Sequence, residues 1–209
     1  AWDSYRNVNK RFAQDMQVLL GDIPNAKILI QDYHFYCLAT YMRQLGIINV
    51  SNIFIHIPWP KAASMARSLP ANVLREIVDG ILANDIVGLQ TDKDRDFLLD
   101  TVGRALRNTS IDWLQKEPVI RHEGRETIVK AYPISIDIKH VQSHLVDEET
   151  KTYVGKLTDQ TDNQVLIAGA ERIDVRKGLV ERLEGFRLLL DRHPELIGKV
   201  QMLLLLVRS

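Results

Sequence analysis

The chain has 209 residues, of which 45% are hydrophobic and 26% charged, the composition of an ordinary soluble globular protein. Its 27 basic and 27 acidic residues balance, which argues against nucleic acid and against a membrane surface as partners. Cys37 is the single cysteine, so an internal disulfide is excluded and a reducing, cytoplasmic compartment is expected.

The first part of the chain alternates helical patterns with short apolar runs. Apolar residues recur at helical spacing over 3–20, and the run at 26–30 predicts a buried strand. Strands that alternate with helices of 10–15 residues predict an α/β fold with a parallel sheet covered on both faces. The next predicted elements are a helix to about residue 44, a strand at 53–56, a helix at 71–83, a strand at 85–89 and a helix at 93–107.

A second βαβ unit is predicted further along the chain. Gly124 lies between two apolar runs and predicts a hairpin, and the polar segment 147–163 predicts a connection between domains. The unit that follows has a strand at 165–169, a helix with leucines on one face, and a strand from Val200.

The end of the chain is unusual for a complete protein. The apolar run at 202–207 is too short to span a membrane and predicts a buried strand with almost no residues after it. The chain also begins without a Met. We therefore expect a fragment of a longer protein.

Polar side chains follow several of the predicted strands. Ligands of open parallel sheets bind at the carboxyl ends of the strands. Asp32 and His34 follow the first strand, His56 follows the second, and Arg172 follows the strand of the second unit. Asp32 and His56 end successive strands, so they can share one crevice. Two structural alternatives stay open, in which Asp32 caps the next helix and His56 is a hydrogen-bonded core histidine.

The segment 171–178 has the features of an anion site. Arg172 lies at a strand end, and Lys177 and Gly178 open the following helix. Backbone N–H groups at a helix start attract anions, and Gly allows a phosphate to approach closely. Arg matches phosphate oxygens with a fork of donors, and Lys adds a point charge. A diphosphate is the predicted ligand, and solvated basic residues in a loop are the alternative.

The remaining motifs give little information about function. The sequence has no metal-ligand spacing, Cys–His pair, Walker loop or Gly-rich dinucleotide motif, so neither a metal nor a cofactor is predicted. Trp59, between Pro58 and Pro60, could stack on a sugar or could be a hydrophobic plug.

Several ordered stretches carry a family resemblance that covers essentially the whole chain. They are Trp2-Asp3-Ser4-Tyr5 with Val8-Asn9, Asp32-Tyr33-His34, the stretch 54–60 with Leu69-Pro70, the stretch 85–91, the stretch 133–137, and Glu171-Arg172-Ile173-Asp174 with Lys177-Gly178-Leu179 and Glu181-Arg182. Together they resemble the trehalose-6-phosphate synthases, retaining glycosyltransferases of family 20.

The resemblance implies a GT-B fold with two Rossmann-like domains. Residues 1–160 would be part of the N-terminal, acceptor-side domain, and 161–209 the start of the C-terminal, nucleotide-sugar-binding domain. It implies transfer of glucose from a nucleotide sugar (UDP-, ADP- or GDP-glucose) to glucose 6-phosphate with retention, giving trehalose 6-phosphate, without a bound metal. The implied partners are this donor and a sugar-phosphate acceptor; a homo-oligomer is left open.

The resemblance also implies roles for individual residues. Arg172 and Lys177, with Gly178, would hold the donor diphosphate, and fixed cations there would stabilise the leaving group in place of a metal. His56 would lie against the donor sugar. Asp32 would orient sugar hydroxyls as a positioning residue rather than a nucleophile, because the leaving phosphate can accept the acceptor proton.

Departures from the family pattern keep alternatives open. Gln31 stands where the family usually has His, and Ser135 where it usually has Gly. Both changes could reflect another acceptor, as in a glucosylglycerol-phosphate synthase or a pseudoglycosyltransferase like validoxylamine 7′-phosphate synthase. A non-catalytic regulatory homologue is a further alternative, against which the intact site residues argue. Other family site residues lie outside the chain, so the chain alone is expected to be inactive.

Overall fold

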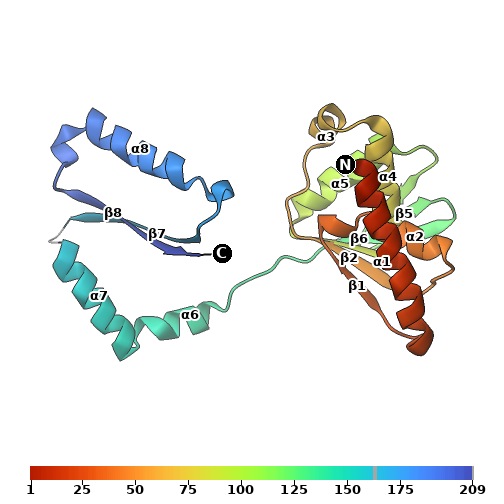
Figure 1. Cartoon of the computed structure of the whole chain (residues 1–209), viewed down its shortest axis with the longest axis horizontal. Helices are drawn as coiled ribbons and strands as arrows, with labels where there is room; N and C mark the ends of the chain where they lie inside the picture. Colours follow the sequence, from red (N-terminus) through yellow and green to blue (C-terminus); the bar gives the residue numbers. More distant parts are fainter. Residues whose placement is uncertain (162–163, 209) are drawn as a thin grey trace. The chain divides into compact units, whose positions relative to one another are not determined.

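The computed structural model describes residues 1–161 and 164–208, which form two compact units, Ala1–Ser135 and Ile136–Ser209 (Figure 1). Asp162 and Asn163 of the predicted connection, and Ser209 of the predicted second domain, lie outside the described residues. The predicted boundary near residue 160 divides the acceptor-side domain from the nucleotide-sugar-binding domain. It differs from the division after Ser135 into compact units, and it stays a prediction.

A six-stranded sheet forms the centre of the first unit. Its spatial order is β1-β2-β3-β6-β5-β4. The first four of these strands run parallel, and β5 and β4 add an antiparallel edge, as Gly124 in the β5–β6 turn predicted. The strands are β1 (Ile28–Gln31), β2 (Ser51–Ile55), β3 (Ile86–Leu89), β4 (Ser110–Asp112), β5 (Val119–His122) and β6 (Arg125–Ala131).

Helices pack on one face of this sheet. Every second residue of β1 and β2 is buried, and these side chains join apolar residues of α2, α4 and α5 in one core. On the other face Leu29 of β1 is 72% exposed, so the described residues do not give the predicted cover on both faces. The helices are α1 (Trp2–Asp22), α2 (Leu38–Gln44), α3 (Ala62–Ser68), α4 (Ala71–Leu82) and α5 (Asp92–Ala105).

One backbone contact fixes α4 closely against the segment before α2. A Cβ on Gly80 would lie 2.2 Å from the carbonyl oxygen of Tyr36, so only glycine fits at this position. Cys37 is buried beside this contact, and burial raises the pKa of its thiol to about 12. The thiol is therefore protonated and packs as a small apolar side chain.

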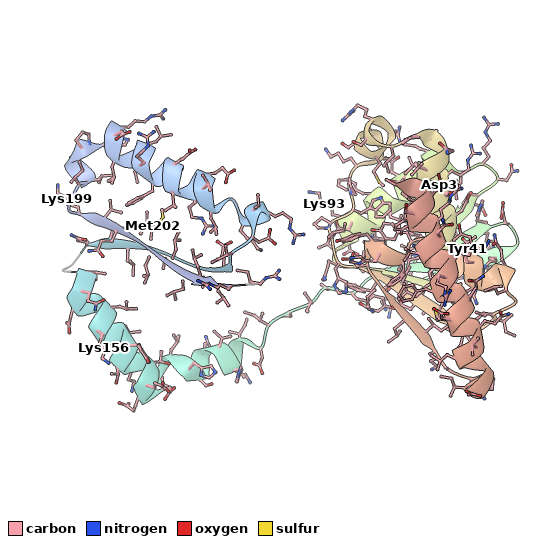
Figure 2. All side chains as sticks on the ribbon, in the orientation of Figure 1. Asp3, Tyr41, Lys93, Lys156, Lys199 and Met202 are labelled. Atoms are coloured by element: carbon pink, nitrogen blue, oxygen red, sulfur yellow. The ribbon has the colours of Figure 1, made fainter. Side chains whose placement is uncertain are left out.

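The second unit is built around a pair of parallel strands. β7 (Val165–Arg172) pairs with β8 (Val200–Val207), and α8 (Leu179–Arg192) lies along one face of the pair (Figure 1). Figure 2 shows Met202 of β8 directed toward α8. α6 (Ile138–Leu145) and α7 (Glu148–Thr161) precede the strands. No helix within 1–161 and 164–208 is long and apolar enough to cross a membrane.

The connection predicted over 147–163 stays a prediction, whereas the expectation of a buried strand at 202–207 needs correction. The polar segment predicted as a connection is helical over α7, where all but a few side chains face solvent. The apolar run at 202–207 is a strand, but Leu205 and Val207 are 59% and 65% exposed. The described sheet has two strands here, so these side chains have few neighbours to pack against.

Candidate functional site at the carboxyl ends of the strands

Asp32 ties the carboxyl end of β1 to that of β2. Its backbone N–H donates to the carbonyl oxygen of Phe54 at 2.8 Å, and its Oδ1 accepts from the backbone N–H of His56 at 3.2 Å. Its backbone has φ 62° and ψ −175°, a region that is essentially reserved for glycine. Such a conformation costs about 1–3 kcal/mol, so the fold holds this carboxylate in place against strain.

His56 lies beside Asp32 and is exposed. Its Nε2 is 2.7 Å from Oε1 of Gln31, and its ring lies 4.7 Å from that of Phe54. In the tautomer whose Nε2 donates to this amide oxygen, Nδ1 is left as an acceptor. The predicted proximity of Asp32 and His56 is therefore present, and Gln31 is a third member of the cluster.

Both structural alternatives for these residues are wrong in the described chain. The carboxylate of Asp32 bonds to His56 and does not cap the short helical turn Tyr33–Phe35 that follows it. His56 is exposed rather than buried in a core. His34 lies in the same segment, where its ring stacks on Tyr33 at 4.1 Å.

Side chains of α1 hold the segment after Asp32, a role that the sequence reasoning did not find. The Tyr5 hydroxyl donates to the carbonyl oxygen of Tyr33 at 2.7 Å and accepts from the N–H of Tyr36 at 2.8 Å. Nδ2 of the fully buried Asn9 donates to the carbonyl oxygens of Tyr5 and of His34, at 3.0 and 3.1 Å. A polar Asn on the buried face of an amphipathic helix was the signal that could have revealed this contact.

Trp59 is a buried hydrophobic plug and not a platform for a sugar. Its side chain is 3% exposed and its Nε1 donates to Oγ1 of Thr101 at 3.0 Å. Its backbone N–H donates to Oδ1 of Asp94 at 3.1 Å. The buried ring has no face open to a sugar, so stacking on a ligand is excluded.

The predicted anion segment lies at the end of β7. Arg172 is the last residue of the strand, Lys177 ends the short turn Val175–Lys177, and Gly178 caps α8 with φ 62°. The left-handed backbone explains the glycine. The N–H groups of Lys177 and Gly178 donate to carbonyl oxygens within the turn. The donors that an anion could use are therefore the N–H groups of the first turn of α8.

The three basic side chains of this segment differ in their surroundings. Arg176 donates to the Asp174 carboxylate at 2.7 Å, and this bond is the main cause that lowers the pKa of Asp174 to about 2. Arg172 and Lys177 are exposed at their side chains. Arg172 and Lys177 are thus the better candidates for a ligand, and Arg176 is a structural partner of Asp174.

The described residues thus form two groups of predicted site residues. Asp32 and His56 lie together with Gln31 in the first unit, and Arg172, Lys177 and Gly178 lie together in the second. Their convergence on one ligand stays a prediction. Within 1–161 and 164–208, no group of three or more His, Cys, Asp or Glu side chains is arranged to hold a metal ion.

The similarity to known proteins extends over the entire sequence. The model of glycosyltransferase family 20 matches residues 1–209. The UDP-forming α,α-trehalose-phosphate synthase of Pichia angusta is 34% identical over 218 residues, which cover 100% of this chain and 43% of that protein. The chain thus spans less than half the length of this relative.

Solved structures agree with the family match. A UDP-forming α,α-trehalose-phosphate synthase from Burkholderia xenovorans in complex with glucose-6-phosphate has a TM-score of 0.77 at 27% identity, covering 100% of this chain and 45% of that one. An E. coli structure described as trehalose-6-phosphate bound with UDP-2-fluoro glucose has a TM-score of 0.78 at 27% identity, covering 100% and 44%. The predicted α/β fold of the GT-B type is confirmed. The chain belongs to glycosyltransferase family 20.

Proposed function

We propose that this chain is a section of a retaining glucosyltransferase that moves glucose from a nucleotide sugar to glucose 6-phosphate and releases trehalose 6-phosphate. The family match over all 209 residues supports this, as do relatives named as UDP-forming trehalose-phosphate synthases. UDP-glucose is the proposed donor because those names specify UDP. A cytoplasmic location and a metal-free reaction are parts of the same proposal.

The cluster of Gln31, Asp32 and His56 is the observation that carries the proposal. Asp32 has one carboxylate oxygen engaged by the His56 N–H, and in the proposed site its other oxygen accepts from a sugar hydroxyl. His56 has its Nε2 engaged by Gln31, so Nδ1 is available to accept from a hydroxyl of the donor sugar. Two fixed acceptors on neighbouring strand ends suit a sugar, whose hydroxyls donate.

The second group supplies the charge that the reaction needs. Cleavage of the glycosyl–phosphate bond leaves negative charge on the departing nucleoside diphosphate. In the proposed mechanism the exposed Arg172 and Lys177 stabilise that charge, and the N–H groups next to Gly178 bind a phosphate oxygen. Asp32 positions the sugars and does not attack the anomeric carbon, since the departing phosphate can accept the proton of the acceptor hydroxyl.

Arg172→Ala in the complete enzyme tests the diphosphate assignment. Removal of one transition-state donor is expected to lower kcat about 100- to 1,000-fold, with UDP-glucose and glucose 6-phosphate as substrates. Arg187→Ala is the matched control, because Arg187 is an exposed arginine of α8 whose guanidinium pairs with Asp191 on the same helix. Thermal unfolding of both variants checks that the fold is retained. Near-normal turnover in Arg172→Ala would refute the assignment of Arg172 to the donor diphosphate.

The acceptor is tested separately, because Gln31 and Ser135 depart from the family pattern. The complete enzyme is supplied with UDP-glucose and, in turn, glucose 6-phosphate, glycerol 3-phosphate and an aminocyclitol phosphate, and products are identified by mass spectrometry. Trehalose 6-phosphate as the main product supports the proposal. A different main product assigns another acceptor, and sugar-phosphate binding without any product assigns a regulatory homologue.

A further inference from the structure

A small cavity lies between α3, α4 and α5 of the first unit, and none of its described lining residues belongs to the cluster of Gln31, Asp32 and His56. Its volume is about 250 Å³. Ala62, Leu74 and Thr101 form its buried floor, at 2%, 6% and 0% exposure. Ala66 and Ala105 form its walls. Because these wall side chains are small, the space between the three helices is open rather than filled.

The floor of the cavity is apolar in effect. Thr101 is its one hydroxyl among the described lining residues, and both of its hydrogen-bonding roles are used. Oγ1 accepts from Nε1 of Trp59 at 3.0 Å and donates to the carbonyl oxygen of Phe97 at 2.8 Å. A ligand group that enters the cavity therefore meets methyl and methylene groups, and no free donor at the bottom.

The rim is strongly basic. Arg75 of α4, Arg104 of α5 and Arg107 after α5 line the cavity, and no acidic residue is among its described lining residues. Arg104 donates from Nε to Asp100 at 2.8 Å, which balances part of this charge from outside the cavity. Three arginines in the lining of one small cavity favour an anion, and the forked donors of a guanidinium group fit carboxylate and phosphate oxygens.

We propose that this cavity binds a small amphipathic anion, with a phosphate or carboxylate head among Arg75, Arg104 and Arg107 and a short hydrocarbon body on the apolar floor between the alanine walls. The volume sets the size of the body. A cavity of about 150 Å³ holds a benzene ring in a protein interior, so about 250 Å³ holds one ring with its charged head. This site shares no residue with the proposed sugar-transfer site and stands independently of it.

Phenyl phosphate is the probe that tests the proposal, in titration calorimetry with the 209-residue chain. Saturable 1:1 binding is expected, and inorganic phosphate and phenol, which lack the body or the charge, should each bind at least about tenfold more weakly. Benzoate replaces phenyl phosphate in a parallel titration to separate a carboxylate ligand from a phosphate ligand.

Variants locate the binding. Arg75→Ala and Arg107→Ala should each weaken phenyl phosphate about tenfold, because each removes a charge-assisted hydrogen bond. Arg67→Ala is the matched control, since Arg67 lies on α3 outside the cavity lining and its guanidinium contacts Ser64. The affinity of this variant for phenyl phosphate should equal that of the wild-type chain. Ala66→Leu fills the cavity from an exposed position of α3 and should abolish binding without loss of charge.

The unfolding transition of each variant shows whether its fold is intact. The proposal is overturned if phenyl phosphate shows no saturable binding to the wild-type chain. It is also overturned if Ala66→Leu and Arg107→Ala, both folded, bind phenyl phosphate as tightly as Arg67→Ala does. Equal affinity for phenol and phenyl phosphate would likewise exclude an anion site.

Discussion

Tyr5→Phe tests whether α1 holds the segment that carries Asp32. The substitution keeps the ring and its stacking on Trp2, and removes only the hydroxyl. That hydroxyl serves two backbone groups, the carbonyl of Tyr33 and the N–H of the buried Tyr36. Burial of the hydroxyl also raises the pKa of Tyr5 above its ordinary value, which agrees with a group enclosed by the fold.

The expected loss of stability follows from the two groups left behind. A buried N–H without a partner costs about 1–3 kcal/mol, and a carbonyl that water can still reach costs about 0.5–1.5 kcal/mol. Together these values predict that the free energy of unfolding falls by about 3 kcal/mol. All three tryptophans lie within residues 1–135, so tryptophan fluorescence during urea unfolding reports on the first unit alone.

Tyr41→Phe is the control for this experiment. Tyr41 is a half-buried tyrosine of α2 (Figure 2), and its hydroxyl has no hydrogen-bond partner among the described residues. Its loss should change the free energy of unfolding by no more than about 0.5 kcal/mol. The reasoning is refuted if Tyr5→Phe costs less than about 0.5 kcal/mol, or if Tyr41→Phe costs as much as Tyr5→Phe.

Two further predictions concern single positions. Gly80→Ala should lower the free energy of unfolding by about 2 kcal/mol in urea, because its Cβ would meet the Tyr36 carbonyl, whereas Gly103→Ala, which meets nothing within 4 Å, should raise it by up to about 1 kcal/mol. Equal effects of the two changes would contradict the close contact. The Asp174 carboxylate should titrate near pH 2 in a carbon NMR titration. Its lowered pKa means that the bond to Arg176 is fully present above pH 3.8 and is lost as pH falls through about 2. A midpoint near 3.8 would show that the bond is absent in solution.

Regular elements with a strong pattern were predictable from the sequence. The helix predicted over 3–20 is α1, and the apolar runs at 26–30, 53–56 and 85–89 are β1, β2 and β3 within about two residues. The sequence predicts a connection over α7 because most of its side chains are polar, and a helix exposed on nearly every side has only a weak apolar stripe to reveal it. α3 has seven residues, too few to show a helical period.

The candidate site was predictable only in part. The strand ends place Asp32 and His56 side by side because parallel neighbours end at the same edge of a sheet, and this followed from the sequence. The contact of His56 with Gln31 depends on side-chain conformations, which the strand pattern does not encode. Trp59 was undecided for a similar reason. Its partner Thr101 lies 42 residues away in sequence, and only the packing of α5 brings the two together.

The backbone at position 32 places stability and ligand orientation in opposition. Glycine adopts this backbone conformation with the least strain energy. However, glycine has no carboxylate that could accept a hydrogen bond from the neighbouring strand. Mutants selected only for thermal resistance should therefore drift toward glycine here, and those selected for sugar binding should keep the aspartate. The hydrogen bonds from Tyr5 and Asn9 of α1 to the backbone of residues 33–36 then help to hold residue 32 in its unfavourable conformation.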